Sequence, residues 1–288
     1  MPDSLETVTD PRALYLDLMK RAVTNWIYAD VEKVVKVVRP VKFWKRWVPT
    51  YFRRRGMEIV HTPYTIDPQL LLDGSSHPLN GHTMIGFRRL DNIQHCVERV
   101  LADNVPGDLI ETGAWRGGAC VFMRAVLKAH GVTDRRVWVA DSFAGFPPPD
   151  PKYAADAGAD FHLDCGDRFD SRDGVYLFVS LERVKANFER YGLLDDQVRF
   201  LKGFFSETLP KAPIDRLAVL RLDGDMYGST MDSLNHLYPK LSVGGYVIVD
   251  DYEMPPCRKA IGDYREKHNI SDEVLRIDGH SVYWRRAR

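Results

Sequence analysis

From Val105 to Val249 the chain alternates short apolar runs, each about as long as a strand, with longer runs that carry apolar residues at helical spacing. The expected strands are 108–111, 136–140, 198–201, 217–222 and 246–249, and the expected helices are 117–130, 181–191 and 230–241. This alternation predicts a parallel sheet covered on both faces. It is the strongest constraint on the fold, because neighbouring parallel strands need a crossover connection between them.

The two ends of the chain depart from this pattern. Residues 273–277 and 281–285 are expected to be strands joined around Asp278-Gly279, a dipeptide typical of hairpin turns. Near the N-terminus, apolar residues at helical spacing predict helices over 14–28 and 90–101. The sequence therefore predicts helices before the sheet and an antiparallel hairpin after it.

Together these patterns predict an α/β fold with a Rossmann-like, mostly parallel sheet that closes on an antiparallel C-terminal hairpin. We expect residues 1–104 to form a helical N-terminal cap or lid over the mouth of the sheet. Residues 105–288 would form the core that contains the sheet. A Pro- and Asp-rich insertion, from Pro147 to about Arg172, interrupts this core after the second expected strand.

Composition argues against several classes of protein. The 288 residues include 40 basic and 40 acidic side chains, so there is no basic surplus of the kind that a general nucleic-acid binder needs. No apolar run approaches the roughly 18 residues that span a bilayer, and the polar, acidic N-terminus is not a signal peptide. The cysteines form no C-x-x-C pair, which fits a reducing compartment. We expect a cytoplasmic protein that makes no contact with nucleic acid or integral contact with a membrane.

The charge is nevertheless uneven along the chain. Residues 31–56 contain nine basic side chains, one acidic side chain and five aromatic ones. A basic, aromatic segment can bind an acidic or lipid-like partner. The simpler interpretation is a solvated flap whose aromatic residues pack against the body of the protein.

Ligands of open α/β sheets bind outside the carboxyl ends of the strands, so the residues there carry the functional information. The first expected strand ends in Glu111-Thr112-Gly113-Ala114-Trp115-Arg116-Gly117-Gly118, a loop whose glycines let backbone N–H groups approach an anion. The second ends at Asp141, where an acid can accept both ribose hydroxyls of a nucleoside. Asp141 lies 28 residues after Gly113, whereas the acid of dinucleotide binders lies about 20 residues on. The glycine loop and Asp141 can therefore be read either as a nucleoside site or simply as the turns that end two strands, and the sequence leaves both interpretations open.

Two acidic pairs form the stronger signal. Asp223-Gly224-Asp225 ends the fourth expected strand and Asp250-Asp251 ends the fifth. Neighbouring parallel strands would bring these carboxylates to one edge of the sheet, where either their pKa values rise or a cation lies among them. An all-oxygen ligand set suits Mg²⁺, although solvated acids at strand ends are the alternative.

A metal beside a nucleoside leaves few reaction classes. The chain has no G-x-x-x-x-G-K-[ST] motif, and its glycine spacing is not that of nicotinamide enzymes. Metal-assisted methyl transfer from S-adenosylmethionine fits best. The cation would bind an acceptor hydroxyl, lower its pKa and direct it toward the methyl group.

Six segments also resemble a known family: HTMIGFRRLDNIQHCVE, GDLIETGAWRGGAC, RRVWVADSFAGFP, RYGLLDDQVRFLKGFFSETLP, LAVLRLDGDMYGSTMDSL and GGYVIVDDY. They closely resemble the macrocin and mycinamicin sugar O-methyltransferases, relatives of the noviose O-methyltransferase. The likeness runs from about Leu14 to Trp284 and is interrupted at 31–83 and 147–175. Because several long motifs occur in order, the resemblance is specific.

The resemblance implies a class I methyltransferase that uses S-adenosylmethionine and Mg²⁺ to methylate a sugar hydroxyl on a macrolide-like natural product during antibiotic biosynthesis. It implies a homo-oligomer, a dimer or larger. Asp225, Asp250 and Asp251 would bind the metal, and Asp225 would also be the general base. Tyr28 and Asp30 match a family segment near the substrate. The expected cofactor-binding residues are Thr83, Met84, Glu111, Thr112, Gly113, Gly117, Asp141, Ser142, Phe205, Ser206 and Asp223.

Two other functions remain as alternatives. The first is O-methylation of a phenol or catechol on an aromatic metabolite. Catechol methyltransferases usually place a lysine near the metal, but Met226-Tyr227-Gly228-Ser229 follows Asp225 here, which favours an aliphatic hydroxyl. The second is a non-enzymatic, cofactor-binding module that docks a partner through residues 31–56. The acidic pairs argue against it, because a binding module needs no metal.

Overall fold

The central strands are runs of aliphatic residues because the sheet is covered on both faces. All six residues of β4 are buried, as are four of the five residues of β1. The computed structural model describes residues 10–29, 68–74, 78, 80–146, 152–156 and 177–288. Its strands are β1 (Asp108–Thr112), β2 (Val137–Asp141), β3 (Val198–Lys202), β4 (Leu217–Leu222), β5 (Leu241–Val249), β6 (Leu275–Arg276) and β7 (Val282–Arg285).

These strands form one seven-stranded sheet in the order β3-β2-β1-β4-β5-β7-β6. The five strands from β3 to β5 are parallel, and Ile110 in β1 lies between Trp138 in β2 and Leu220 in β4. The pairs β5–β7 and β7–β6 are antiparallel. The predicted fold class, a mostly parallel sheet that closes on an antiparallel C-terminal hairpin, is confirmed.

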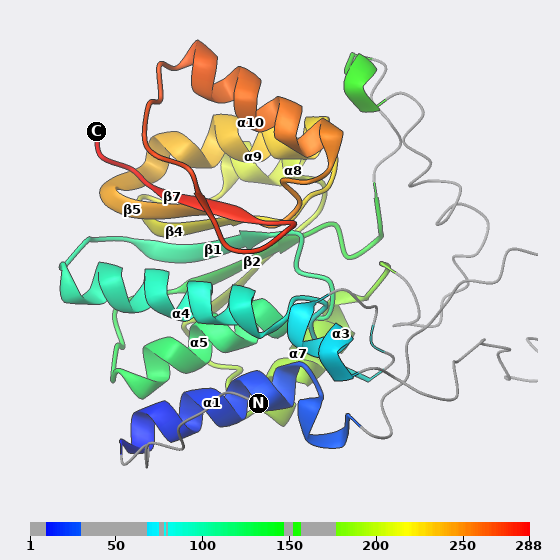
Figure 1. The fold of residues 1–288 in the computed structure, drawn as a ribbon, viewed down its shortest axis with the longest axis vertical. Coiled ribbons are helices and arrows are strands. Elements are labelled where there is room, and N and C mark those ends of the chain that lie inside the picture. Colours follow the sequence, from blue (N-terminus) through cyan, green and yellow to red (C-terminus); the bar gives the residue numbers. More distant parts are fainter. Residues whose placement is uncertain (1–9, 30–67, 75–77, 79, 147–151, 157–176) are drawn as a thin grey trace, which may run out of the picture.

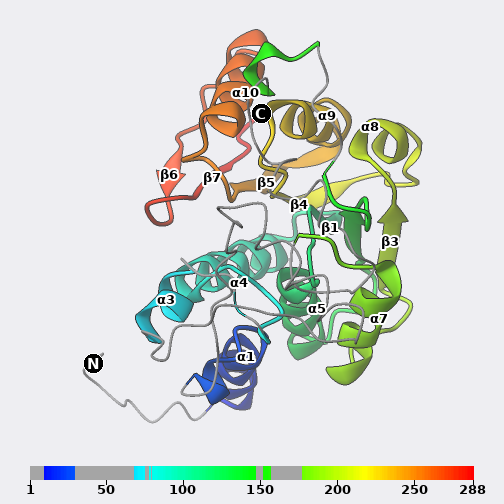
Figure 2. The same ribbon diagram turned by 90° about the vertical axis from the view of Figure 1, so that its right-hand side faces the viewer.

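Helices cover both faces of the sheet (Figures 1 and 2). One layer contains α1 (Pro11–Val23), α4 (Phe87–Ala102), α5 (Gly118–Ala129) and α7 (Leu181–Arg190), and the other contains α8 (Phe205–Thr208), α9 (Tyr227–Leu237) and α10 (Pro255–Lys267). The short α3 (Pro68–Asp73) contacts α4. Single-turn 3₁₀ helices are η1 (Trp26–Tyr28), η3 (Ala154–Asp156), η4 (Leu209–Lys211) and η5 (Tyr238–Lys240). None of the described helices combines the length and the apolar character that crossing a membrane requires.

The N-terminal helices share the core of the sheet. Helix α4 contacts α5, β4 and β5, and α1 packs on α5. Leu16 in α1 and Leu90 in α4 are fully buried in the same apolar cluster as Val121 in α5. The described N-terminal helices therefore lie in the layer over one face of the sheet, while the division at residue 104 stays a prediction.

The structure corrects several of the sequence-based elements. The helix predicted over 14–28 ends at Val23 and is followed by the separate turn η1, and the short helices α3 and α8 were not predicted. Helix α10 was not predicted, although Cys257, Ala260, Ile261 and Tyr264 bury one face of it. Helix α9 begins at Tyr227 rather than at 230, and ends at η5. Strand β5 begins at Leu241 rather than at 246. Its first half was not predicted because Gly244 and Gly245 interrupt the run of apolar residues.

His82 links the turn before α4 to the end of α7. Its Nδ1 lies 2.6 Å from the hydroxyl of Tyr191, and the two rings meet edge to face. Burial, together with the positive charges of nearby arginines, lowers the pKa of His82 to about 4. In the unfolded chain a histidine has a pKa near 6.5. Between pH 4 and pH 6.5 the unfolded state binds more protons than the folded state. The stability that His82 contributes is therefore present above pH 6.5 and is lost as the pH falls toward 4.

We therefore predict that His82→Gln, which removes this titration, reduces the pH dependence of folding. Between pH 7 and pH 5 the free energy of unfolding of the wild type should fall by about 2 kcal/mol more than that of the variant. Urea unfolding at both pH values measures the difference. Equal losses in the two proteins would show that His82 is not buried in its neutral form.

Candidate active site

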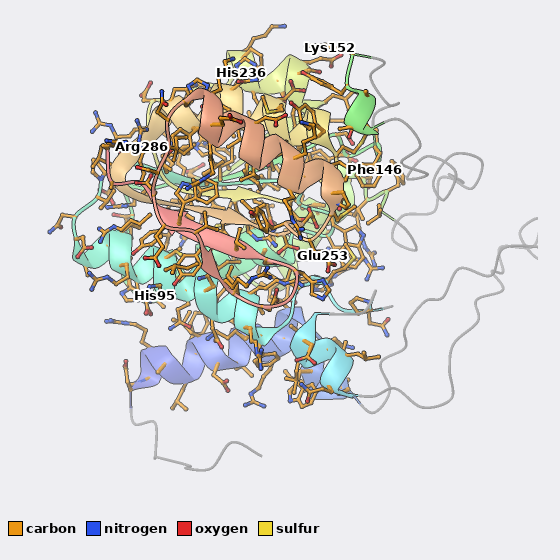
Figure 3. The ribbon with its side chains drawn as sticks, turned by 45° about the horizontal axis from the view of Figure 1, so that its top comes forward. His95, Phe146, Lys152, His236, Glu253 and Arg286 are labelled. Atoms are coloured by element: carbon orange, nitrogen blue, oxygen red, sulfur yellow. The ribbon has the colours of Figure 1, made fainter. Side chains whose placement is uncertain are left out.

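A cleft opens at the carboxyl ends of β1 and β4, the neighbouring strands at which the direction of winding changes. Figure 3 shows Phe146 and Glu253, which follow the carboxyl ends of β2 and β5, toward one side of the molecule, and Arg286, which follows the antiparallel β7, on the other. The open cleft spans about 650 Å³, including the solvent at its mouth. It is lined by Met84, Gly113, Trp115, Asp141, Ser142, Gly145, Phe146, Leu177, Phe204, Phe205, Asp223, Gly224, Asp225 and Ser229.

Gly113 brings the end of β1 into close contact with the end of β4. Its φ is +94°, and a Cβ atom at this position would lie 1.6 Å from the carbonyl oxygen of Asp223. The N–H of Gly113 donates to the carbonyl of Ala140, and the N–H of Asp223 donates to the carbonyl of Thr112, each at 2.9 Å. A side chain at Gly113 would therefore separate the two strand ends that form the floor of the cleft.

Asp141 ties this glycine loop to the end of β2. Its Oδ2 accepts hydrogen bonds from the N–H groups of Ala114 at 2.8 Å and Trp115 at 3.2 Å, and its Oδ1 accepts from Phe143 at 2.7 Å. Burial raises the pKa of Asp141, and these hydrogen bonds oppose the rise. Because a carboxylate offers about four acceptor positions, Asp141 keeps capacity for a further donor in the cleft.

Arg221 holds three carboxylates together beneath the cleft. It is fully buried in β4, where its Nη1 donates to Asp223 at 2.6 Å and to Glu111, and its Nη2 donates to Asp250 at 2.5 Å. A second guanidinium, that of Arg89 in α4, donates to Asp250 at 2.9 Å. Both oxygens of Asp250 therefore face an arginine.

Asp223, Asp250 and Asp251 form a potential metal site. Each can offer one oxygen, and these three oxygens lie within 4.8 Å of one another. The sequence predicted Asp225 as the third ligand and placed Asp223 among the cofactor-binding residues; in this structure Asp223 completes the group. Asp225 follows Asp223 by two residues, and its backbone N–H donates to Oδ2 of Asp251 at 3.2 Å.

The pKa values of these acids rise because burial and mutual repulsion disfavour their charged forms. Burial, the neighbouring Asp223 and then Asp250 raise the pKa of Asp225 to about 7. Burial and Asp250 raise the pKa of Asp223 to about 6, and burial with Asp225 raises that of Asp251 well above its usual range. An oxygen-only group with surplus negative charge suits a hard divalent cation.

The other predicted residues lie outside the cleft lining. Glu111 is buried behind it, where it accepts a hydrogen bond from Sγ of Cys120 at 2.7 Å, and burial raises its pKa to about 7. Tyr28, in η1, is 61% exposed. Asp30 and residues 31–56 lie outside the described part of the chain. The remaining predicted residues that do not line the cleft are Thr83, Thr112, Gly117, Ser206, Asp250 and Asp251.

Sequence reasoning missed part of the lining and the buried arginines. Trp115, Phe146 and Leu177 give the cleft an apolar wall. Trp115 has a φ of +47°, unusual for a bulky residue, and its position inside the glycine-rich loop was the available signal. Arg221 interrupts an otherwise apolar strand, which was a signal for a buried charge.

Comparison with known proteins places the chain in a family of O-methyltransferases. The family profile described as macrocin O-methyltransferase (TylF) matches residues 12–286. Mycinamicin III 3''-O-methyltransferase of Micromonospora griseorubida is 49% identical to the chain, over 95% of this chain and 96% of the relative. An O-methyltransferase of Streptomyces olivaceus, named for the 4' position of a rhamnosyl tetracenomycin C, is 53% identical over 96% of this chain and 94% of the relative.

The fold agrees with that of a solved relative. The structure of the O-methyltransferase NovP aligns with a TM-score of 0.77 and 47% sequence identity, and covers 96% of this chain and 100% of NovP. This likeness, together with the strand order, identifies the fold as that of class I methyltransferases. The fold implies S-adenosylmethionine as the cofactor.

Proposed function

Since the chain belongs to the macrocin O-methyltransferase (TylF) family, we propose that it methylates a hydroxyl of a sugar on a glycosylated natural product in a Mg²⁺-dependent reaction. One observation supports this assignment above the others. The cleft that we expect to bind a nucleoside reaches the end of β4, where the acidic residues begin. Asp141, from the nucleoside side, and Asp225, from the acidic side, therefore line the same cavity. The named O-methyltransferases align with nearly the whole chain. This identifies the protein as an O-methyltransferase and argues against a non-enzymatic binding module.

We assign the cofactor to the part of the cleft between β1 and β2. Gly113, Asp141 and Ser142 lie there, and Phe204 and Phe205 offer an apolar surface for an adenine ring. This combination of polar groups and aromatic side chains in one cleft is what a nucleoside, with its polar ribose and flat base, would need. S-adenosylmethionine supplies an activated methyl group when bound.

We assign Mg²⁺ to Asp223, Asp250 and Asp251 and the general base to Asp225. The donor set fits the ion, because all three ligands are carboxylates and two of them have raised pKa values. Bound Mg²⁺ supplies positive charge that makes a nearby hydroxyl more acidic. Arg221 and Arg89 hold Asp250 in place, while Asp225 remains free of any ion pair with a described cation.

Asp225 is placed to take the proton of the acceptor hydroxyl. Its carboxylate lines the cleft beside the carboxylates that we assign to Mg²⁺, within reach of a hydroxyl bound there. Trp115, Phe146 and Leu177 form an apolar wall in the same cleft, which would help to shield the reacting groups from water. The expected homo-oligomer and cytoplasmic location stay predictions.

The metal assignment predicts a loss of turnover on chelation. With EDTA, methyl transfer to a panel of glycosides that includes mycinamicin III should fall at least about a hundredfold, because the hydroxyl loses its Lewis acid. Added Mg²⁺ should restore the rate. Calorimetric binding of S-adenosylmethionine in EDTA serves as the control for an intact cleft. Undiminished transfer in EDTA would contradict the Mg²⁺ assignment and leave the methyltransferase assignment standing.

A further inference from the structure

Helix α9 begins two residues after Asp225, yet its own N-cap residue cannot cap it. Met226 occupies the N-cap position and makes no side-chain hydrogen bond to the helix. The first N–H groups of the helix are bound by Asp156 instead. Its Oδ1 accepts from Tyr227 at 2.7 Å and its Oδ2 accepts from Gly228 at 2.9 Å. A carboxylate at this position also interacts favourably with the helix dipole.

Asp156 comes from the described part of the insertion, residues 152–156, which begins at Lys152 in Figure 3. This segment contacts α9 and α10, and Asp156 is only 1% exposed. The ring of Tyr153 packs on that of Tyr227 with 5.2 Å between centroids. A Cβ atom on Gly228 would lie 3.0 Å from Cδ2 of Tyr153, so glycine leaves room for the segment.

The turn that carries Asp225 has little stability of its own. Asp225 has a φ of +56°, a left-handed conformation that is unfavourable for non-glycine residues, although aspartate and asparagine tolerate it better than most. The N–H of Met226 donates back to the carbonyl of Gly224 at 2.5 Å. Strand β4 fixes the turn on one side, and the first residues of α9 fix it on the other.

We propose that Asp156 is a positioning residue for Asp225: by binding the first N–H groups of α9 it fixes the far end of the turn and thus the direction of the Asp225 carboxylate. This inference rests on the proposed function, in which Asp225 accepts the proton. Asp156 itself does not line the cleft. Its loss should therefore slow the reaction without weakening the binding of the cofactor.

The test compares Asp156→Asn with Asp263→Asn. The first variant keeps the shape of the side chain but turns an NH₂ group toward one of the two N–H donors. The second is a matched control, because Asp263 holds the same residue of α9 through the Tyr227 hydroxyl, at 2.9 Å, and not through its backbone. Asp156→Ser, which retains one acceptor, replaces the first variant if it does not fold.

We expect Asp156→Asn to lower kcat about tenfold on the best glycoside acceptor, with the KM for S-adenosylmethionine within twofold of wild type. Hydrogen exchange of the Tyr227 and Gly228 amides should accelerate about tenfold or more. Asp263→Asn should leave both quantities within twofold. A purely structural cap would lower the melting temperature and the active fraction, which titration with S-adenosylmethionine measures, but not kcat per active site.

Equal kcat values for the two variants would overturn the assignment. If the wild type methylates no glycoside, the proposed function fails, and crystal structures of the variants decide the inference separately. A shift of Asp225 away from its left-handed conformation in Asp156→Asn alone would support the positioning role. An unchanged Asp225 would refute it.

Discussion

Asp225→Asn should lower kcat at least about a thousandfold, because the variant removes the group that accepts the hydroxyl proton. The substitution keeps the size of the side chain. Asparagine also tolerates the left-handed backbone of this residue, whose φ is +56°, better than most residues do. The fold and the shape of the cleft should therefore survive, and the loss should appear in kcat and not in the binding of S-adenosylmethionine.

The measurement combines initial rates of methyl transfer with calorimetric titration of the cofactor. Asp215→Asn is the matched control, since Asp215 is an exposed acid just before β4, at the end of that strand opposite the cleft. It should retain wild-type turnover. Turnover of Asp225→Asn within tenfold of wild type would exclude Asp225 as the general base while leaving the metal assignment to the chelation experiment.

The second large effect concerns stability. Arg221→Met should lower the free energy of unfolding by about 3–5 kcal/mol, the usual loss when one member of a buried ion pair is removed. The variant leaves Glu111 and Asp250 buried near each other, with one guanidinium fewer to balance their charge. Fitting a methionine into the space does not offset this repulsion.

Urea unfolding of Arg221→Met and Arg124→Met measures this effect. Arg124 is also buried, but its partner Asp195 has a side chain that is 39% exposed and keeps its hydration when the arginine is lost. Arg124→Met should therefore lose less than half as much stability. If the two variants lost equal amounts, repulsion among the carboxylates around Arg221 would contribute nothing measurable to stability, and burial alone would account for their raised pKa values.

The positions of the central strands follow from the sequence where burial is two-sided. The run Leu217–Leu222 is almost entirely apolar because both of its faces are covered, so its position was predictable. Helix α10 was missed because it is polar apart from one narrow buried face. The first half of β5 was missed because its two glycines carry no apolar signal.

The candidate site was predictable to the extent that it depends on strand ends. Adjacent parallel strands bring Asp223 and Asp250 together, and this follows from the pattern alone. Which oxygen faces which partner does not follow, because it depends on Arg221 and on Arg89 from a distant helix. The same holds for Asp156, which reaches α9 from a segment 71 residues earlier in the chain.

The most direct test of the account is the position of the transferred methyl group. The protein is incubated with deuteromethyl-labelled S-adenosylmethionine, Mg²⁺ and a mixture of glycosides and their aglycones, and the products are fragmented by tandem mass spectrometry. We expect label in the sugar fragment of a glycoside and none in the aglycones. Label on a phenol or catechol of an aglycone, with unlabelled sugars, would contradict it and identify the protein as an aromatic O-methyltransferase.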